Sequence, residues 1–138
     1  MKIFILEDNQ DRISLFREKL KGHDLTIAET AQEAINALGT NKNAMTRESH
    51  FDLIFLDHDL GGEEMVGTNG ANTGSEVVRW MAQEMGSGPS IIVHSMNAPA
   101  ALEMQEKLRD VGFYCHRVPF INLKSGLEHY GAMMDGDE

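Results

Sequence analysis

The chain has 138 residues, of which 41% are hydrophobic and 25% charged, and its formal net charge is −10. This size and composition fit one globular domain spanning 1–138 and exclude a disordered or fibrous chain. The acidic charge excludes a general polyanion-binding surface, so we expect no binding to duplex DNA.

The apolar segments are too short for membrane insertion. Runs such as 53–56 and 91–93 fall far below the roughly 20 residues that a membrane-spanning helix needs. Glu7 and Asp8 interrupt the N-terminal apolar run before the core of a signal peptide could form. The single cysteine, Cys115, allows no internal disulfide and is typical of a reducing compartment. We therefore expect a cytoplasmic protein with no membrane partner.

Hydrophobic periodicity and helix-capping residues divide the chain into regular elements. The expected elements, alternately strand and helix in chain order, are 2–6, 9–22, 25–28, 30–39, 52–57, 73–85, 90–95, 97–111, 113–118 and 123–134. Asn9 and Asn97 are suited to capping helices, and Thr30 and Thr73 begin capping-box patterns. Gly39 is expected to end the second helix.

Strict alternation of strand and helix predicts an α/β fold with a parallel sheet covered by helices on both faces. In such sheets, ligands bind at the carboxyl ends of the strands, near the point where the strand order reverses. The residues that follow the strands are therefore the first place to look for a site.

Acidic side chains follow two of the expected strands. Glu7 and Asp8 end the first strand, while Asp57 and Asp59 end the third. Their convergence would be costly unless a cation offset the like charges. Oxygen ligands without cysteine favour Mg²⁺, and Mn²⁺ or Ca²⁺ would also fit. The alternatives are that Asp8 caps the first helix and that Asp57 begins a turn.

Two histidines and a serine flank the same strand ends. His58 follows Asp57, and His94 and Ser95 end the fourth strand. Either imidazole could transfer protons in a reaction, or it could simply form a structural hydrogen bond. The glycine-rich segment between 58 and 73 could be a lid over this edge or an ordinary surface insertion.

The segments IFILEDNQDRISLFREKL and FDLIFLDHDL resemble the first strand and helix and the third strand of response-regulator receiver domains. Glu7 and Asp8 match the acidic metal-binding pair of that family, and Asp57 matches its phosphoacceptor. Asp59 matches the residue whose backbone carbonyl reaches the metal, and Ser95 matches the switch Ser/Thr. The resemblance implies a flavodoxin-like, doubly wound sheet of five strands in the order 2-1-3-4-5.

The resemblance continues in the Pro-Phe pair that follows the fifth strand, but the chain departs from ordinary receivers elsewhere. Val118 stands where receivers have a phosphate-binding lysine, and the neighbouring Arg117 should point to the opposite face. A long glycine-rich loop follows the phosphoacceptor position. With His58 and His94, these departures make the chain most similar to the cyclic-phosphate processing receiver domains. That similarity implies action on cyclic phosphates in RNA repair.

The first functional hypothesis is a Mg²⁺-dependent phosphoesterase that acts on a cyclic phosphate of a small molecule or an RNA end. Glu7, Asp8, Asp57 and Asp59 would form the metal site. Asp57 could act as a nucleophile or orient the attacking water. His58 or His94 would transfer protons, and Ser95 would hydrogen-bond a phosphoryl oxygen.

Three alternatives remain open. The chain could be a non-enzymatic signalling receiver, phosphorylated on Asp57 and acting through a partner protein. Glu7 and the Asp57-x-Asp59 pattern also occur in toprim-like nucleases, although so short a motif is weakly specific. The chain could also be a degenerate receiver that only binds a ligand.

Overall fold

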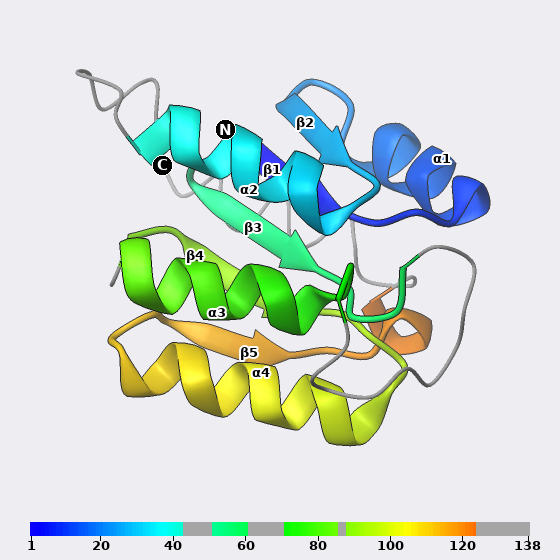
Figure 1. The fold of residues 1–138 in the computed structure, drawn as a ribbon. Helices are drawn as coiled ribbons and strands as arrows, with labels where there is room; N and C mark the ends of the chain where they lie inside the picture. Colours follow the sequence, from blue (N-terminus) through cyan, green and yellow to red (C-terminus); the bar gives the residue numbers. More distant parts are fainter. Residues whose placement is uncertain (43–50, 61–70, 86–87, 124–138) are drawn as a thin grey trace.

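The computed structural model describes residues 1–42, 51–60, 71–85 and 88–123. Strands and helices alternate along the chain (Figure 1). Their bounds are β1 Lys2–Leu6, α1 Gln10–Lys19, β2 Asp24–Ala28, α2 Ala31–Lys42, β3 Leu53–Leu56, α3 Gly74–Glu84, β4 Ser90–Val93, α4 Ala98–Asp110 and β5 Cys115–Arg117. Residues 120–123 are also helical, and the rest of the predicted last helix lies outside the described residues.

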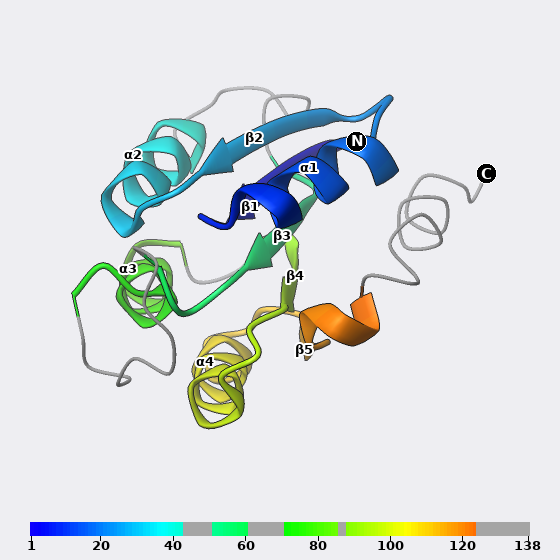
Figure 2. The same ribbon diagram turned by 90° about the vertical axis from the view of Figure 1, so that its right-hand side faces the viewer.

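The five strands form one parallel sheet in the order β2-β1-β3-β4-β5, which confirms the predicted doubly wound fold. Figure 2 views the sheet so that its two faces separate: α2, α3 and α4 cover one, while α1 and the turn at 120–123 cover the other. Among the described residues, no helix has the length and apolar character needed to cross a membrane.

Side chains alternate between the two faces of the sheet, as in any β-strand. In β1, Phe4 and Leu6 pack in the core beneath α2, α3 and α4, whereas Ile3 and Ile5 pack beneath α1. Strands β3 and β4 alternate in the same way, so the core has two layers. This alternation decides which of the residues beyond each strand end can meet.

The helix starts predicted from capping residues are confirmed. Asn9 accepts a hydrogen bond from the backbone N–H of Arg12, and Thr73 and Asn97 cap α3 and α4 similarly. The predicted end of the second helix at Gly39 is wrong, because α2 continues to Lys42. Packing overrides the local signal there, since Gly39 lies beside the Trp80 ring of α3.

The residues that directly follow β3 pair with the residues that directly precede α3. Asp59 and Thr73 form an antiparallel bridge, and the N–H of Gly74 donates to the carbonyl of His58 at 2.9 Å. Asn72, with a φ of 53°, accepts a hydrogen bond from the N–H of Ala31 in α2. The predicted lid concerns mainly residues 61–70, which lie outside the described residues.

Candidate functional site

Strand register brings three of the predicted site residues together. In the sheet, Leu6 pairs with Leu56, and Leu56 pairs with Val93. Continuing the register by one residue places Glu7 beside Asp57 and Asp57 beside His94. Ligand atoms of these three buried side chains lie within 4.8 Å of one another. All three follow the strand positions that face α1, so they share one face of the sheet.

Glu7 is fully buried, and its carboxylate is held by three hydrogen bonds. Oε2 accepts from the backbone N–H groups of Asp8 and Asn9, each at 3.1 Å, and Oε1 lies 2.9 Å from Nε2 of His94. Burial is the largest cause and raises the pKa of Glu7, but the hydrogen bond and charge of His94, the backbone N–H of Asn9 and the charge of Arg12 together outweigh it. The pKa of Glu7 therefore lies below its usual value, and the group is an anion.

Asp57 is also buried but less well compensated. The backbone N–H of His58 donates to Oδ1 at 2.8 Å. Burial is the largest cause that raises the pKa of Asp57 to about 7. The charge of His94 opposes this rise, while the nearby Glu7 carboxylate adds to it. Two carboxylates side by side in a buried place have the electrostatics of a site that favours a cation.

His94 is enclosed by aromatic rings. Its ring meets those of Phe16, Phe120 and Phe55 edge-on, with centroid distances of 5.4, 6.0 and 6.3 Å. The ring is fully buried, and Nδ1 has no hydrogen-bond partner among the described residues. An ionised carboxylate only accepts hydrogen bonds, so Nε2 of His94 is protonated and donates a hydrogen bond to Glu7. In this arrangement His94 supports the Glu7 carboxylate.

His58, Asp59 and Ser95 form a separate network. Nδ1 of His58 lies 2.8 Å from Oδ1 of Asp59, which also accepts from the side-chain amide of Asn97 at 3.1 Å. Ser95 is buried, and its hydroxyl accepts from the backbone N–H of Asn97. The predicted site residues thus fall into two groups, because His58 and Ser95 follow strand positions of the opposite face.

Asp8 is half-buried and lies next to Glu7, and it is not one of the three residues whose ligand atoms cluster. The carboxylate of Asp59 is likewise engaged with His58 and Asn97. Because the ligand atoms that cluster at this edge belong to Glu7, Asp57 and His94, a metal there would contact the carboxylates of Glu7 and Asp57 first. Their oxygen donors fit a hard divalent cation such as Mg²⁺ or Mn²⁺.

Arg12 of α1 is a site residue that the sequence analysis missed. Its guanidinium Nη1 lies 3.8 Å from Oε1 of Glu7 and 3.9 Å from Oδ2 of Asp57. One local signal could have identified it: a cation in the first turn of a helix opposes the helix dipole. Such a violation of a local rule often marks a functional position.

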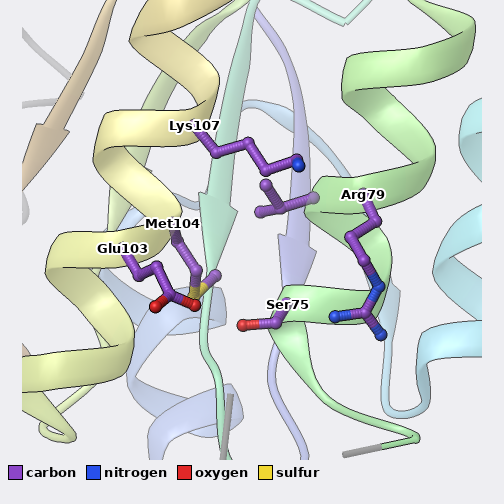
Figure 3. A pocket seen from close by; sticks show the side chains of 6 residues that line it. Ser75, Arg79, Glu103, Met104 and Lys107 are labelled. Atoms are coloured by element: carbon purple, nitrogen blue, oxygen red, sulfur yellow. The ribbon is translucent and has the colours of Figure 1, made fainter. Parts of the chain in front are cut away.

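A pocket between α3 and α4 is distinct from this site (Figure 3). The residues that line it include positively and negatively charged side chains. They are Ser75, Val78, Arg79, Glu103, Met104 and Lys107. None of the clustered residues at the strand ends lines it. The start of α3 nevertheless lies close to the strand-end site, because Gly74 packs directly against the backbone carbonyl of Asp57.

The strand order and the acidic strand ends define the chain as a receiver-type α/β domain. Residues 1–110 match the family described as the cyclic-phosphate processing receiver domain, and the chain belongs to that family. This membership leaves the toprim-like alternative without support. None of the curated proteins compared with the chain matches it.

Solved structures of receiver domains share the fold. The phosphorylated cyanobacterial phytochrome response regulator RcpA has a TM-score of 0.66 and 20% identity, covering 99% of this chain and 95% of that one. The Mn²⁺-bound form of response regulator Rcp1 has a TM-score of 0.64 and 17% identity, covering 95% and 91%. A CheY-like receiver protein from Methanospirillum hungatei JF-1 has a TM-score of 0.60 and 20% identity, covering 97% and 93%.

Proposed function

We propose that this domain binds Mg²⁺ or Mn²⁺ at Glu7 and Asp57 and hydrolyses a cyclic phosphate on a nucleotide or an RNA end. The observation that carries the proposal is the pair of buried carboxylates, whose oxygens cluster with a nitrogen of His94 within 4.8 Å. Membership in the cyclic-phosphate processing receiver family supports the substrate class. The Mn²⁺ in the structure of Rcp1 supports the choice of ion.

In the proposed reaction, water attacks phosphorus, one ring P–O bond breaks, and the leaving oxygen takes a proton. A divalent cation, when bound, neutralises phosphoryl oxygens and assists the attack. Asp57 orients the attacking water or the phosphoryl group from the end of β3. Glu7, held by His94 and two backbone N–H groups, keeps its charge and position throughout.

The two histidines are not equivalent candidates for proton transfer. Nε2 of His94 is already paired with Glu7. Nε2 of His58 has no hydrogen-bond partner among the described residues, while Asp59 fixes the ring through Nδ1. An imidazole oriented by a carboxylate at one nitrogen and available at the other is the usual arrangement of an acid–base histidine. Because Nε2 is buried and His58 follows the face of β3 opposite to Asp57, the leaving oxygen would have to reach His58 across the end of β3.

A signalling role is the second candidate, and the position of Asp57 favours it. A carboxylate at the end of β3, beside the cation of Arg12, could itself accept a phosphoryl group. RcpA has been solved in a phosphorylated form, which supports this reading by analogy. The domain would then act through a partner protein.

Purified protein assayed with 2′,3′-cyclic nucleotides and with RNA bearing a cyclic phosphate end separates the two functions. We expect turnover with Mg²⁺ or Mn²⁺ that EDTA and Asp57→Ala abolish. Loss of an acid–base imidazole in His58→Ala should slow turnover by about 100- to 10,000-fold. Asp24→Ala, at an exposed position on β2, is the control. Absence of turnover together with a stable beryllofluoride adduct on Asp57 would favour signalling.

A further inference from the structure

Arg12 stands beside both carboxylates of the candidate metal site. It belongs to α1, and its guanidinium lies over the Phe120 ring, 4.8 Å from the ring centroid. Nη1 is 3.8 Å from Glu7 and 3.9 Å from Asp57. Its side chain is 28% exposed, whereas the two carboxylates are buried. Arg12 therefore lies between the acidic pair and solvent.

The guanidinium of Arg12 forms no hydrogen bond with Glu7 or Asp57. Both N–O distances exceed the roughly 3.2 Å that an N–H···O bond requires. Among the described residues, no acceptor takes a hydrogen bond from this guanidinium, although it has five N–H donors. The Phe120 ring instead provides a flat surface that holds the guanidinium plane in place. The donors are available for an anion that arrives from solvent.

The charge balance of the site indicates which kind of anion would bind to these donors. Glu7 and Asp57 together carry two negative charges when ionised, and one divalent cation offsets them. A phosphoryl group adds negative charge that the metal alone leaves uncompensated, and a nearby cation would offset it. Arginine also matches phosphate geometry, because its planar fork can donate two parallel hydrogen bonds.

The end of β5 supplies no cation to this face. Val118, at the position of the lysine in ordinary receivers, packs against the same core cluster as Phe120 and is uncharged. Cys115 packs in the opposite core layer, so alternation directs Arg117 to that opposite side as well. Within the part of the chain that the structure describes, the arginine beside the acidic pair on this face is Arg12 of α1.

We propose that Arg12 is the phosphate-binding residue of this site. In the metal-free protein its charge faces Glu7 and Asp57, and when a divalent cation takes over these carboxylates the guanidinium binds the phosphoryl group. The proposal rests on the proposed function for the divalent cation at Glu7 and Asp57 and for the phosphoryl ligand, and it requires no turnover.

Calorimetric titration of the full chain, first with Mg²⁺ and then with inorganic phosphate, tests the proposal. Arg12→Met removes a competing cation, so we expect Mg²⁺ to bind several-fold more tightly than in wild type. Phosphate should bind the Mg²⁺-loaded variant roughly 10- to 100-fold more weakly, as expected for the loss of charge-assisted hydrogen bonds. Arg12→Lys should retain part of the phosphate affinity. Arg17→Met, an exposed position on the same helix, should change neither.

The opposite directions of the two effects exclude a merely structural role. The proposal is overturned if Arg12→Met binds phosphate as wild type does, if it weakens Mg²⁺ and phosphate together, or if wild type with Mg²⁺ does not bind phosphate. Circular dichroism of each variant verifies folding, and Arg12→Lys keeps the test decisive should the methionine variant misfold. If phosphate binds through Arg12 but no cyclic phosphate is hydrolysed, the proposed reaction fails while this inference stands.

Discussion

Nε2 of His94 and Oε1 of Glu7 lie 2.9 Å apart, and both side chains are fully buried although 87 positions separate them in the chain. The pair joins the end of β4 to the end of β1 across β3. Because Asp57 follows β3, this hydrogen bond connects the two residues that lie on either side of Asp57.

Replacing His94 with leucine should destabilise the fold strongly. The Glu7 carboxylate would keep its buried charge without its strongest compensation, which typically costs about 3–5 kcal/mol of unfolding free energy. His94→Gln, which retains an N–H donor, should cost less. Urea denaturation measures both, with His116→Leu at an exposed histidine as the control. Equal stability of His94→Leu and wild type would contradict the supporting role of this pair.

Asp57→Asn should stabilise the metal-free protein, and the gain should depend on pH. Asp57 ionises near pH 3.9 in the unfolded chain but at about 7 in the folded one. Between these values the folded state holds a proton that the unfolded state has lost, so stability falls as pH rises. The gain from Asp57→Asn should be near zero below about pH 4. Above about pH 7 it should reach its maximum, on the order of 4 kcal/mol.

Denaturation in EDTA across this pH range measures the gain. Asp24→Asn, an exposed aspartate on β2, is the matched control and should show no comparable trend. A gain for Asp57→Asn that is independent of pH would mean that the buried charge of Asp57 is not its cause.

Mg²⁺ should raise the melting temperature of wild type, because a ligand that binds only the folded state stabilises it by mass action. At 100 times the dissociation constant the gain is about 2.7 kcal/mol. Since Asp57 must lose its proton to bind a cation, the apparent affinity should fall about tenfold per pH unit below pH 7. Asp57→Ala should remove the shift. Melts of wild type that do not respond to Mg²⁺ or Mn²⁺ would show that the metal site is wrong.

Gly74→Ala should disturb the site from the far side of Asp57. A methyl group there would overlap the backbone carbonyl of Asp57 and come within 2.7 Å of the terminal methyl of Met104. Overpacking of this kind typically lowers the free energy of unfolding by about 1–3 kcal/mol. We expect it also to weaken metal binding. Gly39→Ala is the matched helical control, because its methyl would only touch the Trp80 ring at 3.5 Å. The Gly39→Ala variant should gain about 0.5–1 kcal/mol in free energy of unfolding, because alanine favours the helix. Thermal melts with and without Mg²⁺ would check both variants, and an unchanged Gly74→Ala would refute the close packing.

The sequence by itself determined the fold and much of the site's composition. Short apolar runs and capping residues such as Asn9 and Asn97 act locally, so they place strands and helix starts from nearby residues alone. The position of acids after β1 and β3 likewise follows from strand ends, and parallel sheets bring such ends to one edge. Gly39 shows the limit of local reasoning, because contact with Trp80 from another helix let α2 continue past it.

Only the tertiary structure decided which of the candidate residues meet. Register and alternation join Glu7 and Asp57 to His94 on one face, while His58 turns to Asp59. The burial that raises the pKa of Asp57 depends on helices packed from distant parts of the chain. Arg12 reaches the site for the same reason: the crossing of α1 over the sheet carries its charge to the carboxylates of two separate strands.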